Sequence, residues 1–586
     1  MIIKTKFTDA SEEKSNVDEG VAPSESTRPS FSRGFETADH ATECPVNNLV
    51  TPLLTDMYQI TMVYAYWMSG RHEEKAVFDL FFRTNPFHGE YTIFCGLDQV
   101  LRYVSSYRFS ESDINYIRTL LPPPSDASRL PLHESFFNTY LAEMDCRSVR
   151  ICAVSEGTVV FPREPLLRVE GPLGVCQLLE TTLLTLVNYP SLVATNAARH
   201  VLAAGQGDGN RPAPQLLEFG LRRAQGPDGG YSASKYCLIG GFHATSNCMA
   251  GKLLGVPVRG THAHSFVQTF ASLDEVRGIA IDGINIMEKV LHYRNVVLGG
   301  SYLTTNDGEL AAFISYASSF PKTFLCLIDT YDTLRSGVLN FVLVSLVLHD
   351  LGYIPLGIRL DSGDLAYLSL EVAAVFEEIS ERFHLPFFQN LSIVASNDIN
   401  EEVLHALSKQ PHSLTAFGIG TNLVTCQAQP ALGCVYKLVE INGKPRIKLS
   451  QDIIKVTIPG KKRVYRLYGS KGGPLLDVLI GSDDEVPRVG EKILCRHPFM
   501  AQKRAHVVPT KVESLLNLVF DGGKGVVVEI GTIDQAREHV ARQMKIMRSD
   551  ILRDIHPSPY KVSVTDKLFT FLHDLWLDES PVKELS

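Results

Sequence analysis

Residues 354–364 read IPLGIRLDSGD, a short apolar run that passes directly into a polar turn. Six further runs of this kind lie between residues 215 and 419, separated by helical stretches. The seven runs are Gln215–Phe219, Cys237–Phe242, Gly255–Arg259, Thr323–Ile328, Ile354–Leu360, Leu391–Ala395 and Leu414–Ile419. Continuous apolar runs are typical of parallel strands buried on both faces. The pattern predicts a (β/α) barrel, complete or irregular, and leaves an open doubly wound sheet as the alternative.

The segments on both sides of this region have other patterns. Residues 53–66 and 172–187 are apolar at helical spacing, with Thr55 as the expected N-cap of the first helix. Asn442-Gly443 separates two strand-like runs and predicts a type I′ hairpin. We therefore expect a second α/β domain formed by the N- and C-terminal segments. The predicted boundaries are a disordered extension at 1–48, the N-terminal part of the α/β domain at 49–190, the barrel at 191–425, and a β-rich segment with a helical tail at 426–586.

Composition excludes several classes of protein. The chain has 586 residues, of which 45% are hydrophobic and 21% charged, as in a packed soluble protein. Its net charge of −9 argues against a sequence-independent nucleic-acid partner. The longest apolar run, Val338–Leu348, falls short of the roughly 18 residues of a membrane span. The 11 cysteines are scattered without a C-x-x-C pair, so we expect a cytosolic protein with reduced thiols.

Polar side chains follow the predicted strands, where a barrel collects its functional groups at one mouth. These positions carry Glu218, Arg222, Arg223, Asn247, Thr261, His262, His264, Asp329, Asp332, Arg359, Asp361, Asp364, Ser396, Asn397, Asp398, Gly418, Gly420 and Thr421. Guanidinium groups bind phosphate oxygens, carboxylates hold ribose hydroxyls or hydrated metal, and glycine amides approach phosphate closely. The predicted mouth therefore suits a phosphorylated substrate bound with Mg²⁺.

Five separated motifs resemble the nicotinate phosphoribosyltransferase family. They are LTDMYQ at 54–59, EFGLRRAQG at 218–226, GTHAHSF at 260–266, RLDSGD at 359–364 and GIGTN at 418–422. They occur in that family's order, and the resemblance runs from about Val50 to the C-terminal tail. It implies an irregular barrel beside an α/β domain, and a homodimer with active sites at the subunit interface. It also implies nicotinate, phosphoribosyl pyrophosphate and ATP as substrates, Mg²⁺ or Mn²⁺ as cofactor, and the making of nicotinate mononucleotide with ATP hydrolysis.

The resemblance also assigns roles to single residues. His264 matches the catalytic histidine that the family phosphorylates. The other assignments are Tyr58, Thr261 and Arg359 to nicotinate, Thr421 to phosphoribosyl pyrophosphate, and Arg222, Asp361 and Gly420 to its phosphate and ribose. No metal ligand is assigned. His262 departs from the family, in which a small or apolar residue is expected, and it raises the question of which histidine carries the phosphate.

Two alternative functions remain at this point. A nicotinamide- or quinolinate-using phosphoribosyltransferase would share the barrel and the phosphate turns. A catalytically inactive homologue that acts only by interaction would keep the fold, but His264, Arg359 and Thr421 are intact. Asn247 occupies the position where nicotinamide-using relatives are expected to carry an aspartate. Because a carboxylate there would repel nicotinate, its absence favours the acid as substrate.

Overall fold

The computed structural model describes residues 47–581, with gaps at 206 and 209–210. The disordered extension expected at 1–48 therefore lies almost entirely outside the described residues. All ten cysteines of the described part are free, and eight of them are buried. No helix among the described residues combines the length and the apolarity needed to cross a membrane.

Six parallel strands form the sheet that was expected in the middle of the chain. Their order is β12-β13-β14-β15-β8-β9, with β8 at Gln215–Glu218, β9 at Ala244–Thr245, β12 at Leu325–Leu327, β13 at Gly357–Leu360, β14 at Ser392–Ser396 and β15 at Ala416–Ile419. The last strand along the chain pairs with the first, so that Gly418 lies opposite Leu217. This cyclic order is that of a barrel, whereas an open doubly wound sheet keeps its first strand away from its last.

The barrel is irregular because one junction lacks a strand ladder. On one side, β9 is continued only by a single parallel bridge from Thr245 to Val258. On the other side, β12 pairs with β13, and its second edge has no strand partner among the described residues. We call the gap between residues 258–262 and β12 the barrel seam. It lies directly before the segment that carries His264.

Two of the seven predicted strands, Cys237–Phe242 and Gly255–Arg259, do not form as predicted. Cys237–Ile239 ends helix α7, Gly226–Ile239, and the true strand β9 begins five residues later at Ala244. A short apolar run in a buried helix looks like a buried strand, because periodicity cannot separate them. The run Gly255–Arg259 contributes only the bridge at Val258. The other five runs contain strands that begin or end within three residues of the predicted limits.

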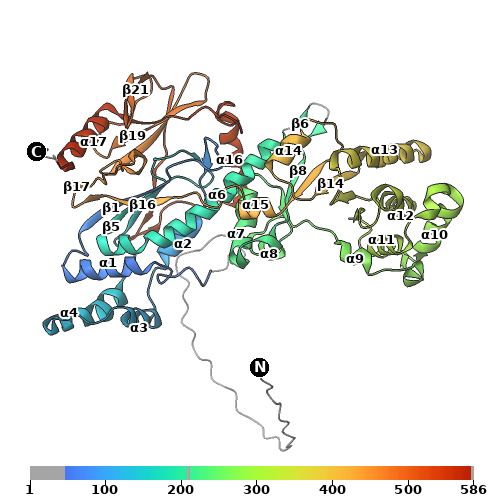
Figure 1. The fold of residues 1–586 in the computed structure, drawn as a ribbon, viewed down its shortest axis with the longest axis horizontal. Coiled ribbons are helices and arrows are strands. Elements are labelled where there is room, and N and C mark those ends of the chain that lie inside the picture. The colour runs from blue at the N-terminus through green and yellow to red at the C-terminus, as the bar shows by residue number, and fades with distance from the viewer. Residues whose placement is uncertain (1–46, 206, 209–210, 582–586) are drawn as a thin grey trace, which may run out of the picture. The chain divides into compact units, whose positions relative to one another are not determined.

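Helices connect and flank the parallel strands (Figure 1). They are α8 at Cys248–Leu254, α9 at His264–Gln268, α10 at Ile286–His292, α11 at Asp307–Ser319, α12 at Val338–Asp350, α13 at Leu365–Phe383, α14 at Glu401–Leu407 and α15 at Thr421–Thr425. Residues 338–348 of α12 are all buried, which explains the longest apolar run of the sequence without a membrane.

A seven-stranded sheet combines segments from both ends of the chain. Its order is β17-β16-β1-β5-β3-β23-β24, with β1 at Lys75–Phe81, β3 at Arg150–Ala153, β5 at Leu167–Pro172, β16 at Val435–Ile441, β17 at Lys444–Pro445, β23 at Asn517–Asp521 and β24 at Gly525–Val526. Strand β1, blue in Figure 1, pairs antiparallel with the orange β16. The second α/β part is thus built by N- and C-terminal segments, as the sequence predicted.

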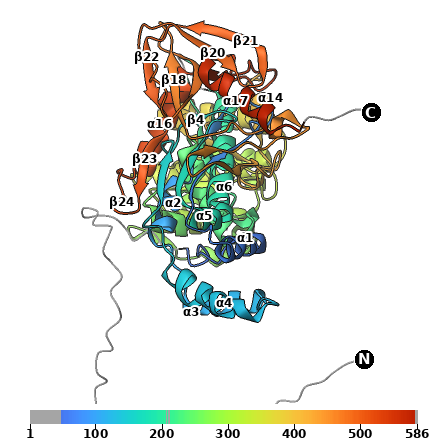
Figure 2. The same ribbon diagram turned by 90° about the vertical axis from the view of Figure 1, so that its left-hand side faces the viewer.

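A third sheet contains only C-terminal strands, in the order β21-β20-β25-β19-β18-β22. They are β18 at Lys462–Tyr468, β19 at Pro474–Gly481, β20 at Ile493–His497, β21 at Met500–Val507, β22 at Lys511–Ser514 and β25 at Val562–Thr565. Helix α17, Asp566–Glu579, packs against β19, β20 and β25 and can be followed in Figure 2. Helix α16, Ile533–Ile546, packs against α7 instead.

The expected local signals outside the barrel are partly confirmed. Asn442 and Gly443 have φ of 50° and 71°, as a type I′ turn between β16 and β17 requires. Helix α1, Met57–Met68, begins after Asp56 and not after Thr55. The helix predicted at 172–187 is two helices, α5 at Leu173–Leu178 and α6 at Glu180–Ala204. Remaining short elements include α2 at Leu97–Ser105, α3 at Glu111–Leu120 and α4 at Leu130–Ser135.

Candidate active site

Arg359 lies near the carboxyl end of β13 and reaches across the barrel seam. Its Nη2 donates to the carbonyl oxygen of His262 at 2.8 Å, and its Nη1 to Oγ1 of Thr261 at 3.4 Å. Burial lowers the pKa of the Arg359 guanidinium, whereas Asp361 and Asp329 raise it. Two of the three residues assigned to nicotinate, Thr261 and Arg359, are therefore in contact within one subunit.

His264 is the first residue of α9 and is held between two strand ends. Its Nδ1 lies 3.1 Å from Oγ1 of Thr330, which follows β12. Its Nε2 lies 3.6 Å from Oδ2 of Asp361, which follows β13. The side chain is 40% exposed, so a ligand can approach it. Sequence reasoning missed Thr330, although its place directly after Asp329 at a strand end was a usable signal.

Two aspartates near His264 present carboxylate oxygens, and each is held by hydrogen bonds. Asp361 accepts from Ser396 Oγ at 2.7 Å through its other oxygen. Asp329 accepts from the Asp361 amide at 2.9 Å and from Ser362 Oγ at 2.5 Å, both through Oδ2. Its Oδ1 is buried without a hydrogen-bond partner among the described residues. A carboxylate oxygen of this kind fits a hard divalent cation such as Mg²⁺ or Mn²⁺.

The two glycine turns of the mouth lie against each other. The amide of Phe219 donates to the carbonyl of Ile419 at 2.8 Å, where β8 meets β15. A Cβ on Gly220 would come within 2.3 Å of Val424 and 2.9 Å of the Gly420 carbonyl. Only glycine allows the β8 turn to approach Gly420 and Thr421 so closely. Thr421 begins α15 directly after the last strand, as the resemblance implies for a phosphate contact.

Arg222 and Glu218 differ in their surroundings. Arg222 is exposed in the short turn after β8 and lies near enough to Arg359 to lower the pKa of that guanidinium. Glu218 is fully buried and accepts from the Gly220 amide, from Ser234 and from Thr245. The Glu218 carboxylate therefore supports the turn from below, while Arg222 is available to a ligand.

Tyr58 is not brought to this mouth. It lies on α1 with 52% of its surface exposed, and its phenol pKa is raised by burial, Glu180 and Asp56. Burial lowers the pKa of Lys437, and the cations Arg83 and Lys448 lower it as well. Glu180 acts on Lys437 in the opposite direction. Arg83 Nε is buried without a hydrogen-bond partner among the described residues. Tyr58 thus lies on an exposed part of α1 beside Glu180 and Asp56, and no contact among the described residues joins it to Arg359 or His264.

The comparisons with known proteins cover nearly the whole chain. Three family models match: the nicotinate phosphoribosyltransferase N-terminal domain at residues 53–188, the family itself at 214–472, and the C-terminal domain at 461–572. Nicotinate phosphoribosyltransferase 2 of Arabidopsis thaliana is 51% identical over 565 residues, which are 94% of this chain and 99% of the relative. Nicotinate phosphoribosyltransferase of Homo sapiens is 41% identical, over 90% and 97% of the two chains. The chain belongs to the nicotinate phosphoribosyltransferase family.

Solved structures agree with this family membership. The crystal structure of human nicotinic acid phosphoribosyltransferase superposes with a TM-score of 0.79 and 39% identity, over 89% of this chain and 99% of that one. Nicotinate-nucleotide pyrophosphorylase from Pyrococcus furiosus has a TM-score of 0.55 at 19% identity, over 86% and 97% of the chains, and shows the shared fold alone. The motifs that resembled the nicotinate phosphoribosyltransferases therefore lie in a chain with that family's fold.

Asn247 has a structural task at this nicotinate phosphoribosyltransferase mouth. Its Oδ1 accepts from the amides of Met249 and Ala250 and caps helix α8, and its Nδ2 donates to Ser234 at 3.1 Å. The residue is 2% exposed. Its side chain is thus an uncharged amide that caps a helix, and it adds no carboxylate to this buried cluster.

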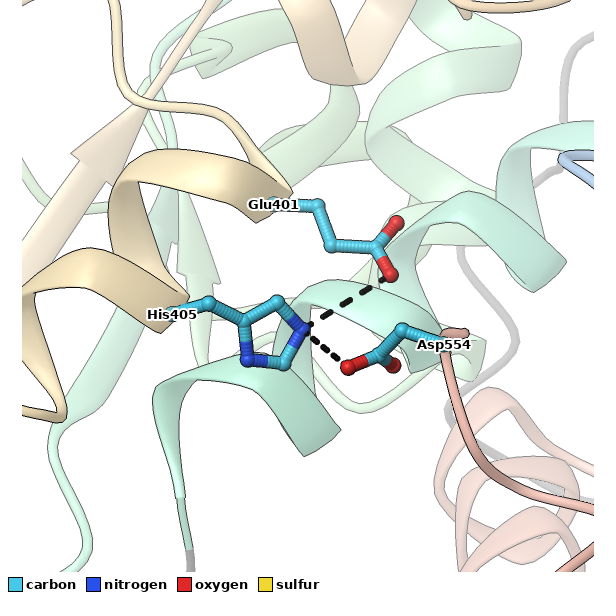
Figure 3. Close-up of side chains that lie close together, drawn as sticks. All are labelled: Glu401, His405 and Asp554. Carbon is cyan, nitrogen blue, oxygen red and sulfur yellow. Dashed lines mark ion pairs between the residues drawn. The ribbon is translucent and has the colours of Figure 1, made fainter. Parts of the chain in front are cut away.

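A second cluster of titratable groups lies away from the mouth, at Glu401, His405 and Asp554 (Figure 3). His405 Nε2 is 2.5 Å from Asp554 and 4.0 Å from Glu401. Arg199 of α6 donates to both oxygens of Glu401, at 2.9 and 2.6 Å. Because Arg199 already neutralises Glu401, the arrangement is that of an ion-pair junction between α6, α14 and the segment before β25.

Proposed function

We propose that this chain is an ATP-coupled nicotinate phosphoribosyltransferase. It joins nicotinate to phosphoribosyl pyrophosphate, releases pyrophosphate and nicotinate mononucleotide, and hydrolyses ATP to ADP and phosphate. This is the first step of NAD synthesis from nicotinate. The observation that carries the proposal is the grouping of Arg359 with Thr261 and of His264 with Asp361 at one barrel mouth. Family membership supports the transferase activity, and the ATP coupling is the finer part of the proposal.

Arg359 is proposed to bind the carboxylate of nicotinate. A planar guanidinium matches a carboxylate in geometry and charge, and partial burial strengthens the pairing. Thr261 contacts the same guanidinium and offers a hydroxyl to the pyridine or its carboxylate. The pyridine nitrogen has no proton to lose at neutral pH, so correct placement against the ribose is sufficient. Nicotinate is favoured over nicotinamide because Asn247 adds no carboxylate to repel it.

Arg222, Gly420 and Thr421 are proposed to hold the phosphates of phosphoribosyl pyrophosphate, and Asp361 the ribose. Loss of pyrophosphate leaves positive charge on the sugar and negative charge on the leaving group, so cations near the leaving group lower the barrier. Asp329 and Asp361 would hold Mg²⁺ or Mn²⁺, because Asp329 Oδ1 is a buried acceptor without a donor. The ion, when bound, supplies positive charge beside the departing pyrophosphate.

His264 is proposed to carry a phosphoryl group taken from ATP. One imidazole nitrogen attacks the γ-phosphorus, the bond to the bridging oxygen breaks, and ADP leaves with that electron pair. Water later takes the phosphoryl group as inorganic phosphate and restores the imidazole. Thr330 and Asp361 contact the two ring nitrogens and orient the ring for this exchange. The glycosyl transfer itself needs no base, so coupling is the better use of this residue.

The active unit is proposed to be a homodimer in which the exposed Tyr58 of α1 meets the partner's barrel mouth. Tyr58 is half exposed and makes no contact with Arg359 or His264 of its own chain that would place it at the mouth. Glu180, which acts on Tyr58, also acts on Lys437, and Lys437 has Arg83 and Lys448 as cationic neighbours; phosphoribosyl pyrophosphate is strongly negative. A cytosolic location is also proposed, in keeping with ten free cysteines.

A pyrophosphate-release assay tests the proposed function. Nicotinate, nicotinamide and quinolinate are compared at equal concentration, each with and without ATP. We expect nicotinate to cause pyrophosphate release that ATP stimulates. Nicotinamide and quinolinate should cause little pyrophosphate release. Equal use of nicotinamide would assign the chain to the nicotinamide-using class. No release with any substrate would favour the catalytically inactive homologue.

A further inference from the structure

Neither the resemblance nor the proposed reaction gives a task to His262 of the motif GTHAHSF. It lies two residues before His264 and directly at the barrel seam. Its Nε2 accepts from the amide of Leu327, the last residue of β12, at 3.4 Å. No strand ladder spans the seam among the described residues, so this contact supplies an acceptor that a neighbouring strand would otherwise provide.

The main chain of the same residue holds Arg359. The carbonyl oxygen of His262 accepts from Arg359 Nη2 at 2.8 Å, which is shorter than the 3.4 Å contact of Nη1 with Thr261. Leu327 and Arg359 are paired residues of β12 and β13. His262 therefore contacts both neighbouring strands, one through its ring and the other through its backbone. The ring contact and the backbone contact with the guanidinium thus belong to the same residue.

Packing fixes the orientation of the ring. It meets Tyr316 of α11 edge-on, with centroids 4.8 Å apart, and Phe266 of α9 at 5.4 Å. Burial is the main cause that lowers the pKa of His262 to about 4; Arg359 and His264 act in the same direction, and a backbone hydrogen bond at Ala263 opposes them. The ring therefore stays neutral where cytosolic enzymes work. A neutral ring can accept a hydrogen bond beside a guanidinium, whereas a charged one would repel Arg359.

We propose that His262 is a positioning residue for nicotinate: it bridges the barrel seam as a neutral acceptor and thereby sets the place of Arg359. This inference rests on the proposed function, because it concerns the residue that binds the substrate carboxylate. It separates the two histidines of the motif by role. His262 acts on substrate binding through Arg359, and His264 acts on ATP.

Three variants test the role. His262→Phe keeps an aromatic ring of similar size but removes the acceptor, and His262→Gln places an amide oxygen near the position of Nε2. Tyr316→Leu is the matched control, because it removes a packing partner of the ring and keeps the acceptor. We expect His262→Phe to raise the nicotinate KM about five- to tenfold, the range for one lost hydrogen bond, with kcat and the phosphoribosyl pyrophosphate KM within about twofold of wild type. His262→Gln should restore the nicotinate KM to within about threefold.

Two further measurements distinguish a positioning role of His262 from a purely structural one. The phosphoenzyme should form in all three variants, and the pH profile of kcat/KM between pH 6 and 8 should keep its shape in His262→Gln. Equal effects of His262→Phe and Tyr316→Leu on the nicotinate KM would overturn the proposal, as would a wild-type KM in His262→Phe or no rescue by glutamine. If His262→Phe does not fold, His262→Leu takes its place. Wild type is assayed in parallel, so a failure of the proposed function is seen separately as absent nicotinate turnover.

Discussion

Arg359 combines a charge, burial and two contacts at the barrel seam, and its role can be tested directly. Arg359→Ala leaves the nicotinate carboxylate without its cation in a partly desolvated site. The loss of such a pair typically costs roughly 2–5 kcal/mol, so we expect a large rise in the nicotinate KM or loss of turnover. Steady-state kinetics with varied nicotinate provide the measurement. The control is Arg277→Ala, which removes a surface guanidinium that is 71% exposed. A normal nicotinate KM in Arg359→Ala would contradict the assignment.

His264 and His262 are chemically similar but differ in exposure and contacts. We expect His264→Ala to lose the acid-labile phosphoenzyme and the nicotinate-stimulated ATPase, because the imidazole between Thr330 and Asp361 is missing. A slow transfer that does not depend on ATP should remain, since the phosphate and carboxylate contacts remain. His262→Ala should still take up label from γ-labelled ATP. The opposite pattern, with label lost at His262 and kept at His264, would reverse the assignment.

At the scale of elements, helix α11 carries a buried carboxyl behind the mouth. Glu309 accepts from Ser336 at 2.6 Å and from Asn340 of α12 at 3.0 Å. Burial is the main cause that raises the Glu309 pKa from about 4.5 to about 7, and Asp329 and Asp332 contribute. Between about pH 4.5 and 7, Glu309 therefore keeps its proton in the folded protein, whereas the same carboxyl has lost it in the unfolded chain. Its stabilising effect is full below about pH 4.5 and is lost as the pH rises through 7.

Glu309→Gln removes this titration and keeps a neutral amide in the network. We expect the variant to be more resistant to urea than wild type above pH 7, by up to about 3 kcal/mol, and to differ less at pH 5. The urea midpoint of barrel unfolding, followed at pH 5 and pH 8, measures the effect. Glu371→Gln on the exposed side of α13 serves as the control. If Glu309→Gln changed the free energy of unfolding by the same amount at pH 5 and at pH 8, Glu309 would be ionised in the folded state at both pH values.

At the scale of the whole molecule, the proposed site needs two subunits. Tyr58 and His264 belong to different groups of the same chain, so each single variant should inactivate both sites of its homodimer. Mixing Tyr58→Ala with His264→Ala should restore part of the activity, because a heterodimer contains one site with both native residues. Activity is measured after subunit exchange, which is checked with two size-tagged chains. Free exchange without any recovery of activity would exclude the shared-site arrangement.

The sequence by itself determined what depends on local pattern. Continuous apolar runs predicted five strands of the barrel, because a strand buried on both faces has no polar alternation. Asn442-Gly443 predicted its turn, because both residues accept positive φ. The five motifs named the family, and the strand pattern placed Arg359 and Thr421 at strand ends. Thr261 and His264 instead follow a run that forms only a bridge at Val258. Whether each of these residues binds its assigned ligand stays a prediction for the experiments above.

Only the tertiary structure decided what depends on contacts between distant segments. The cyclic strand order requires β15 to meet β8, and no local pattern encodes that pairing. The seam at His262, the proton held by Glu309 and the separation of Tyr58 from the mouth arise from burial and neighbours contributed by other elements. The run Cys237–Phe242 was mistaken for a strand for the same reason. Hydrophobicity shows that a segment is buried, whereas its partners decide in which conformation.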